Sequence, residues 1–326
     1  MDIFKRDITG IVLRVLVSIS ILIFLFLRIE IKDFLKIVGS LKVGLLFLAF
    51  LFFLISHILW FWRWRIILKA LNVDFNFHTV LSSFAAGLFF NLVLPSTLGG
   101  DFLRITDFSQ KTKRPKEIIS SVFLDRLSGY VGLELVLIIS LIFGYHLVND
   151  KNVFLVVSIF SFTLIFLLFL LFNSFLYSKI NRFLHLKKNK FFSYISALYD
   201  CVYYFKRKKG MILKNLFLSL AIQLLIPLVY FIIALALGKT INWIYFFIFI
   251  PVISVIIILP LSIGGLGLRE MAMVYFFSQA GLPKDISLVV SLIGSVFLLI
   301  VSCLGGIIYA SMLHTGRIQH NQKFRI

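Results

Sequence analysis

The chain has 326 residues, of which 60% are hydrophobic, and its mean hydropathy is +1.03. A sequence this apolar cannot present a water-soluble surface over its whole length, which excludes an ordinary soluble domain and indicates a polytopic membrane protein. The formal net charge of +19 would suit a nucleic-acid binder, but the Lys and Arg residues gather in polar segments between apolar runs. We therefore predict an all-α integral membrane protein without a nucleic-acid partner.

Eight apolar runs are long enough to cross a hydrocarbon core of about 30 Å as helices. In chain order they are Ile8–Leu27, Val43–Leu68, Val80–Leu98, Ile118–Tyr145, Val153–Phe172, Met211–Leu237, Ile241–Ile263 and Ile286–Met312. The first run has no obvious signal-peptidase site, so we expect it to be the first transmembrane helix. Two further segments, Asp101–Ser109 and Leu268–Gln279, are too short and too polar to cross alone.

A short pattern occurs once in each half of the chain: Pro, three residues, Gly-Gly, three residues, Arg, at 95–104 and at 260–269. Proline and glycine interrupt helices, and interrupted backbone inside a bilayer is tolerated only where protein or a water-filled cavity surrounds it. Paired interruptions in two halves point to a transporter substrate site. The residues that we assign to these re-entrant motifs are Asn91, Pro95, Ser96, Gly99, Gly100, Pro260, Ser262, Gly264, Gly265 and Gly267.

The basic residues predict the topology. The long polar stretch 173–214 is rich in Lys and Arg, and together with the 111–116 loop and the C-terminal tail it should be cytoplasmic. The segment Val80–Ser109 would then dip in from the cytoplasm and Ile241–Gln279 from outside, so that about eight transmembrane helices and two re-entrant hairpins form an inverted repeat. A simpler alternative keeps both hairpins as ordinary spanning helices.

The same reasoning divides the chain into four parts. We expect a first transmembrane half with its re-entrant motif at 1–173, a basic amphipathic cytoplasmic linker at 174–210, a second half with its motif at 211–313, and a basic cytoplasmic tail at 314–326. Both termini should be cytoplasmic, in the plasma (cytoplasmic or inner) membrane. The linker carries aromatic residues among its cations and could gather acidic lipids, or its charges could serve topology alone.

Charged residues also fall inside the apolar part of the sequence, where each costs at least about 2.5–3.5 kcal/mol on insertion scales and commonly marks a pathway. The candidates for a lipid-headgroup path are Arg104, Arg126, Arg269, Asp101, Asp125, Glu134 and Glu270. Arg126 could make bidentate contacts with a phosphate. Alternatively, Arg126 forms a buried structural pair with Asp101 or Asp107, and the glycines only allow close helix packing. Glu270 and Asp101 are candidate counter-ions of Arg269 and Arg104.

Other polar positions have simpler interpretations. Asn91 and Gln223 are expected to form interhelical hydrogen bonds. The run of Trp, Phe and Arg at 60–65 is interpreted as an interfacial aromatic belt with snorkelling arginines. The cysteines, Cys201 and Cys303, and the six histidines show no metal-ligand spacing, so we predict no metal and no cofactor.

Three motifs resemble those of a known family. They are Asn91-x-x-x-Pro95-x-x-x-Gly99-Gly100-Asp101-x-x-Arg104, Asp125-Arg126-x-x-Gly129 and Pro260-x-Ser262-x-Gly264-Gly265-x-Gly267-x-Arg269-Glu270. In these motifs the chain resembles the flippase-like transmembrane domain of the lysylphosphatidylglycerol synthase/flippase proteins and their standalone relatives. The resemblance implies inverted halves that move a phospholipid headgroup between leaflets. The soluble aminoacyltransferase domain of two-domain members has no counterpart in this sequence, so we expect no synthase activity.

We therefore expect a protein that is not an enzyme and that translocates an anionic or zwitterionic phospholipid, or a polyprenyl-phosphate-linked lipid. Membrane lipids are its expected partners, and a homodimer is left open. No ATP-binding P-loop is present, so it would act as a facilitator or use an ion gradient. Two other classes stay open: a membrane-embedded enzyme acting on polyprenyl phosphate through Asp101, Asp125 or Glu270, and a small-solute or ion transporter.

Overall fold

The computed structural model describes residues 20, 39, 41–93, 99–148, 150–173, 190–258, 262 and 264–314. All regular secondary structure in this part of the chain is helical, which agrees with the predicted all-α class. Most of the first predicted run, 8–27, lies outside the described residues. The motif residues Pro95, Ser96 and Pro260 lie outside them as well.

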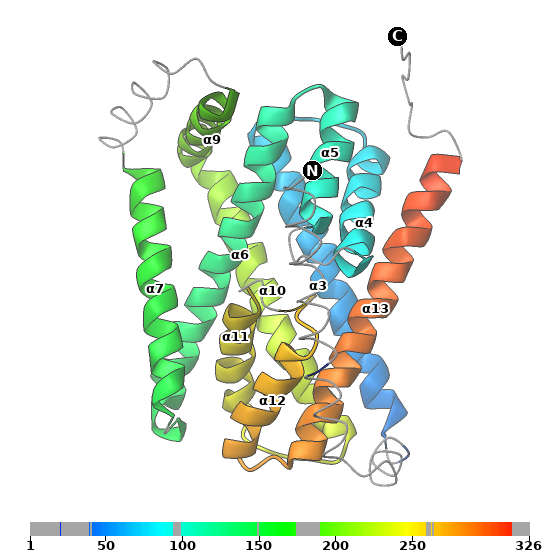
Figure 1. Ribbon diagram of the computed structural model, residues 1–326, viewed down its shortest axis with the longest axis vertical. Coiled ribbons are helices and arrows are strands. Elements are labelled where there is room, and N and C mark those ends of the chain that lie inside the picture. Colours follow the sequence, from blue (N-terminus) through cyan, green and yellow to red (C-terminus); the bar gives the residue numbers. More distant parts are fainter. Residues whose placement is uncertain are drawn as a thin grey trace.

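Five of the described helices are long and apolar enough to cross a membrane, so the chain is a multi-pass membrane protein. They are α3 (Val43–Ala70), α6 (Pro115–Gly144, continued by the short 3-10 helix η1, Tyr145–Leu147), α7 (Lys151–Phe172), α10 (Lys209–Ala236) and α13 (Lys284–His314). At 1.5 Å per residue the 28 residues of α3 extend about 42 Å, more than a hydrocarbon core requires. In Figure 1 these helices run along the length of the molecule. The predicted number of eight spanning helices is not confirmed.

Two of the predicted spanning runs form shorter helices that fold back as hairpins. The first hairpin consists of α4 (Phe77–Val93) and α5 (Gly99–Thr112), and the second of α11 (Ile244–Ile258) and α12 (Leu268–Gln279). The longest of the four, α4, has 17 residues and extends about 26 Å, which is shorter than the apolar core of a bilayer. Figure 1 shows α4 and α5 toward one end of the molecule and α11 and α12 toward the other. The re-entrant placement and the inverted repeat stay predictions.

The apolar side chains form two cores. One core lies where α10 to α13 meet, and Ile233, Phe246 and Phe277 are fully buried in it. The other joins the second half of α3 to α4, α5, α6 and the helix α9 (Lys190–Arg207). Helix α6 contacts α10 closely at Gly132, where an added Cβ would lie 2.9 Å from the backbone of Ser219. A side chain there would force the two long helices apart.

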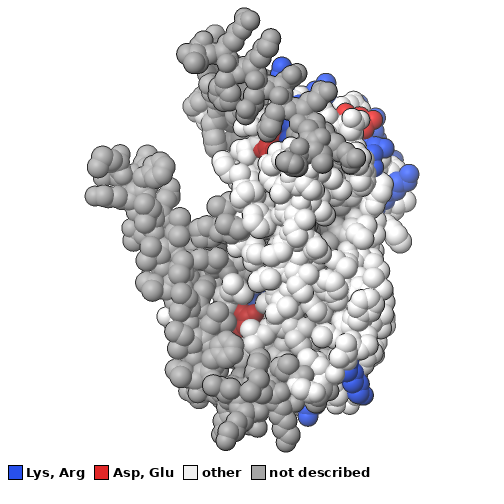
Figure 2. All heavy atoms as spheres, turned by 90° about the vertical axis from the view of Figure 1, so that its right-hand side faces the viewer, with Lys and Arg blue, Asp and Glu red and all other residues white. Residues whose placement is uncertain are grey.

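The predicted linker contains α9, which packs against α6 and α7. Val202 and Phe205 of α9 are buried, so part of its apolar face is covered by the bundle. In Figure 1, α9, the turn between α5 and α6, and the C-terminal end of α13 all lie at the same end of the molecule. On the face in Figure 2, Lys and Arg gather near the two ends and the middle is mostly uncharged. This arrangement suits a protein that crosses an apolar layer.

The interpretation of the 60–65 run as an interfacial belt is wrong for Arg63 and Trp64, whereas Trp62 is exposed. These residues belong to α3, and Trp64 is fully buried while Arg63 is 5% exposed. Arg63 has a carboxylate partner on α6, so this side chain points into the bundle instead of reaching for the surface. Arg65, by contrast, contacts the rings of Trp62 and Phe77 by cation-π interactions.

Candidate functional site

Asp125 on α6 is the centre of a buried polar network. Its Oδ1 accepts a hydrogen bond from Arg63 Nε at 2.9 Å. Its Oδ2 accepts from Trp60 Nε1 at 2.9 Å and from Arg104 Nη2 at 3.2 Å. Trp60 and Arg63 reach the same carboxylate because they are three residues apart on one helix face. Since Asp125 is 1% exposed and Arg104 2% exposed, this network holds α3, α5 and α6 together away from solvent.

Asp101 on α5 extends the network to Arg126. Its Oδ2 accepts from Arg126 Nε at 2.5 Å, and its Oδ1 lies 3.4 Å from Arg104 Nη2. The pairing of Arg126 with Asp101 agrees with one of the two partners considered from the sequence. Asp107, the other, is paired with Lys111 at 2.5 Å. The Arg126 side chain is 28% exposed, so it is the accessible end of an otherwise buried chain of charges.

The first glycine motif brings α4 and α5 into direct contact. Gly100 N donates to Asn91 Oδ1 at 3.0 Å, which confirms the predicted hydrogen bond between helices at Asn91. A Cβ on Gly100 would lie 2.0 Å from Gly87 O, a distance that no side chain tolerates. Close packing is therefore the role that the geometry of Gly100 demonstrates. It also fixes Asp101 and Arg104 at the start of α5, beside α6.

The second glycine motif turns the chain into α12. Gly264, Gly265 and Gly267 have φ values of 59°, 80° and 81°, in the left-handed region that glycine adopts readily. Gly267 is the N-cap of α12, and its N–H donates to Glu270 Oε2 at 2.7 Å. Ser262, just before the turn, is buried, and its Oγ lacks a hydrogen-bond partner in the described structure. These contacts set the direction in which α12 leaves the turn.

Glu270 does not pair with Arg269, so the expectation of a direct counter-ion is wrong. The Glu270 carboxylate is fully buried, and its Oε1 accepts from Ser291 at 3.2 Å and from Ser295 at 3.0 Å. Arg269 instead donates Nη1 to Ser295 Oγ at 3.2 Å and Nη2 to Gly264 O at 3.3 Å. Adjacent residues on a helix point in different directions, which explains why the two charges separate.

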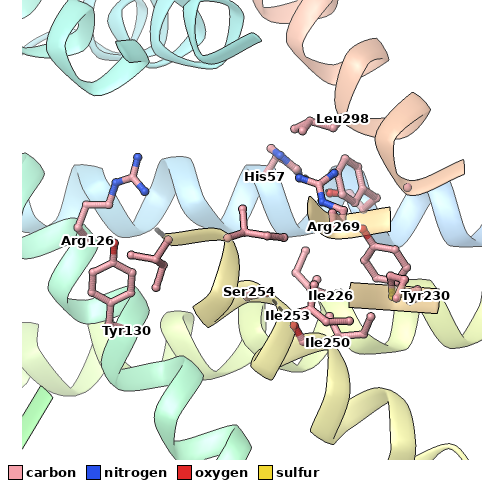
Figure 3. Close-up of a pocket in the computed structure, with 15 residues that line it drawn as sticks. His57, Arg126, Tyr130, Ile226, Tyr230, Ile250, Ile253, Ser254, Arg269 and Leu298 are labelled. Carbon is pink, nitrogen blue, oxygen red and sulfur yellow. Dashed lines mark hydrogen bonds between the residues drawn. The ribbon is translucent and has the colours of Figure 1, made fainter. Parts of the chain in front are cut away.

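A cavity of about 480 Å³ lies between α3, α6, α10, α11, α12 and α13. This volume falls in the usual range for ligand sites. Its lining is mostly apolar, with two arginines, and comprises Phe53, His57, Arg126, Tyr130, Ile226, Tyr230, Ile250, Ile253, Ser254, Ile257, Ile258, Arg269, Met273, Gly294 and Leu298. Figure 3 shows Arg126 beside Tyr130 at one end of the cavity and Arg269 nearer Tyr230 at the other. Residues far apart in the sequence thus place two guanidinium groups in one apolar cavity.

The other charged candidates lie outside the cavity lining. Arg104 is buried in the network and stacks on Trp64, with Cζ 4.5 Å from the ring centre. Asp101 and Asp125 belong to the same network and Glu270 to the cap of α12. Glu134 accepts a hydrogen bond from Ser161 of α7, on another side of α6. The structure therefore places Arg126 and Arg269 in one cavity and does not place Glu134 there.

Sequence reasoning missed Trp60 and Arg63 as partners of Asp125, and His57 and Tyr230 as cavity residues. A signal for Arg63 was available, because a deep carboxylate such as Asp125 requires a donor and α3 carries arginine late in a long apolar run. His57 and Tyr230 sit singly in apolar sequence and carry no such signal. The predicted interhelical bond of Gln223 is confirmed, since its Nε2 donates to Gly129 O at 3.2 Å.

Comparison with known proteins adds a family. A family described as "Lysylphosphatidylglycerol synthase TM region" matches residues 11–306. The UPF0104 membrane protein of Methanocaldococcus jannaschii is 23% identical over 308 residues, covering 89% of this chain and 90% of the relative. The UPF0104 membrane protein of Pyrococcus horikoshii is 22% identical over 148 residues, 44% of each chain. No solved structure matches.

Proposed function

Because the chain belongs to the family of the lysylphosphatidylglycerol synthase transmembrane region, we propose that it translocates a phosphate-bearing lipid between the leaflets of a membrane. One observation carries this proposal: Arg126 and Arg269 line the same cavity, whose remaining walls are mostly apolar. A lipid phosphate that leaves water needs compensating charge, because an unpaired charge in an apolar medium costs several kcal/mol. Guanidinium groups supply that charge with paired N–H donors.

Arg126 and Arg269 are held in place by different groups. Arg126 is anchored by Asp101 through Nε. Arg269 is held by Ser295 and by a backbone carbonyl of the glycine turn. A headgroup that moves from one guanidinium to the other would stay compensated while the isoleucine-rich wall of α11 contacts its apolar part. Arg104 and Arg269, which occupy the same position in the two glycine motifs, therefore differ in role. Arg104 is a buried structural residue, and Arg269 is a candidate to bind the lipid phosphate.

Translocation accounts for the cavity better than chemistry on polyprenyl phosphate. The three carboxylates that such an enzyme would use as base or nucleophile, Asp101, Asp125 and Glu270, do not line the cavity. Each is already engaged by several hydrogen-bond donors. We therefore propose that the protein is not an enzyme and that membrane lipids are its partners.

We also propose the inner-membrane orientation expected from the sequence. The basic residues near Lys113 and in α9 lie at one end of the molecule, together with the C-terminal end of α13, which supports a common cytoplasmic face with both termini on it. The two hairpins at opposite ends support an inverted repeat in which each half contributes one re-entrant motif.

The test is translocation of a fluorescent anionic phospholipid in proteoliposomes. Arg126→Gln and Arg269→Gln should each insert like the parent protein but slow translocation at least about tenfold, since each 1.36 kcal/mol of barrier is a factor of ten. Lysine should restore only part of the rate, because it keeps the charge and loses the planar fork. Arg114→Gln removes an exposed guanidinium outside the cavity and is the matched control.

Three results would point elsewhere. Parental rates in both cavity variants would refute the role of the arginines. Uptake of a soluble tracer into sealed vesicles would favour the solute transporter, and release of a soluble phosphate or sugar product from polyprenyl lipid would favour the enzyme.

A further inference from the structure

We propose that the cavity selects a lipid headgroup with net negative charge, a phosphate without a compensating amine, and discriminates against aminoacylated headgroups. An aminoacyl group with one ammonium cancels the charge of a phosphodiester, and a lysyl group, with two, reverses it. This inference rests on the translocation function proposed above, and it narrows the class of lipid that the same cavity takes.

Arg269 supplies the first reason. No carboxylate of the described residues lies within 4.0 Å of its guanidinium, and both donors that it uses go to neutral oxygens. Glu270 is adjacent in sequence, but its two oxygens accept from Gly267, Ser291 and Ser295. Arg269 therefore offers a positive charge to the cavity without a direct counter-ion from the described chain.

The network behind Arg126 supplies the second reason. Within the described structure, Arg63, Arg104 and Arg126 are linked to two carboxylates, Asp125 and Asp101. Three guanidinium groups thus share these two carboxylates. Because Asp101 also lies beside Arg104, Arg126 does not have that carboxylate to itself. A phosphate at Arg126 would therefore meet a guanidinium whose described carboxylate partner is shared with Arg104.

The lining supplies the third reason. Among the described residues it contains two arginines and no Asp or Glu, so none of these lining side chains pairs with an ammonium as an ion. Tyr130 and Tyr230 could attract a cation through their rings. However, Tyr130 accompanies Arg126 and Tyr230 accompanies Arg269 in Figure 3, so a second cation there would meet like charge. The charges of this cavity therefore attract an anionic headgroup and repel the ammonium of an amine-bearing headgroup.

Two lipid classes have the required chemistry, an acidic phospholipid such as phosphatidylglycerol and a polyprenyl phosphate. Inorganic phosphate shares the anion but has no apolar part to contact the isoleucines of the lining. The experiment therefore compares these three anions with lysylphosphatidylglycerol and phosphatidylcholine.

The measurement is equilibrium competition against fluorescent phosphatidylglycerol on the purified full chain in detergent. Phosphatidylglycerol or polyprenyl phosphate should bind at least about tenfold more tightly than lysylphosphatidylglycerol, equivalent to about 1.4 kcal/mol. Inorganic phosphate should compete only weakly. Arg269→Gln should remove most of this preference, Arg126→Gln should reduce it, and Arg114→Gln should keep it. The stronger competitor of the two anionic lipids identifies the source of the phosphate.

Several outcomes would overturn the inference: lysylphosphatidylglycerol binding as tightly as phosphatidylglycerol, an unchanged preference in Arg269→Gln, inorganic phosphate competing as well as the lipids, or no saturable binding. Binding is measured without a bilayer, so it is independent of translocation. Selective binding without translocation would refute only the proposed function. Equal translocation of anionic and aminoacylated lipids would refute only the selectivity.

Discussion

Replacing Asp125 by Asn should destabilise the protein far more than removing either cavity arginine. The carboxylate of Asp125 is 1% exposed and joins three donors, from Trp60, Arg63 and Arg104. Asparagine keeps nearly the same shape, so the change removes the charge and converts one acceptor into a donor that faces Arg63 or Arg104.

The expected loss follows from what is left behind. Arg63 is then buried without a carboxylate, and Arg104 keeps only the 3.4 Å contact with Asp101. Removing one partner of a buried ion pair typically costs about 3–5 kcal/mol, because the remaining charge is buried and uncompensated. We expect a loss of that size for Asp125→Asn. Arg104→Gln in the Asp125→Asn background should cost less than in the parent, since the lost interaction is shared.

The assay is unfolding in mixed micelles by added denaturing detergent, followed by tryptophan fluorescence. Trp60 donates to Asp125, and Trp64 lies against Arg104, so two of the four tryptophans respond to the state of the network. Glu134→Gln is the matched control, the same kind of change on the same helix at a carboxylate that no described Lys or Arg contacts. An Asp125→Asn variant as stable as the parent, or no more destabilised than Glu134→Gln, would refute the view that this network locks α3, α5 and α6 together.

Three further predictions test the hairpin, the path and the topology. Gly100→Ala should lower the free energy of unfolding by at least about 1–3 kcal/mol, because the added methyl would lie 2.0 Å from backbone of α4; Gly210→Ala, where nothing lies within 4 Å, should not. Glu134→Gln should translocate lipid at the parental rate, since its side chain faces α7, and a tenfold loss would return Glu134 to the path. In a cysteine-free background, an impermeant thiol reagent applied to intact cells should label Lys284→Cys and not Lys113→Cys; labelling of both, or of neither when both react after lysis, would refute the inverted-repeat topology.

The sequence predicted the two interrupted glycine motifs better than it predicted which apolar runs form spanning helices. The runs Val80–Leu98 and Ile241–Ile263 satisfied the length criterion for spanning, yet α5 packs back against α4, and α12 packs back against α11. Run length alone does not mark where the chain turns, since a helix-breaking motif can follow an apolar run that is long enough to span. The spacing of proline and glycine predicted the turns, because these residues act on the backbone itself.

The charged residues show the limit of sequence reasoning most clearly. Arg104 and Arg269 occupy the same position in their motifs, and the sequence treats them alike. In the structure Arg104 is sealed between Asp125 and Trp64, whereas Arg269 lines the cavity. The difference comes from the neighbours: α5 packs on α6, which presents Asp125, while α12 packs on α13, which presents serines.

The sequence by itself determined that the chain lies in a membrane, that it is helical and where the two motifs interrupt it. Hydrophobicity, charge clustering and helix-breaking residues are local properties, so they act in the same way wherever the chain lies. Only the tertiary structure decided which carboxylate each arginine meets, that Trp60 and Arg63 turn inward, and that Arg126 and Arg269 share one cavity. Those outcomes depend on how each helix is rotated and where it crosses its neighbours. Side chains from opposite halves of the chain meet there, and no spacing within one helix specifies that meeting.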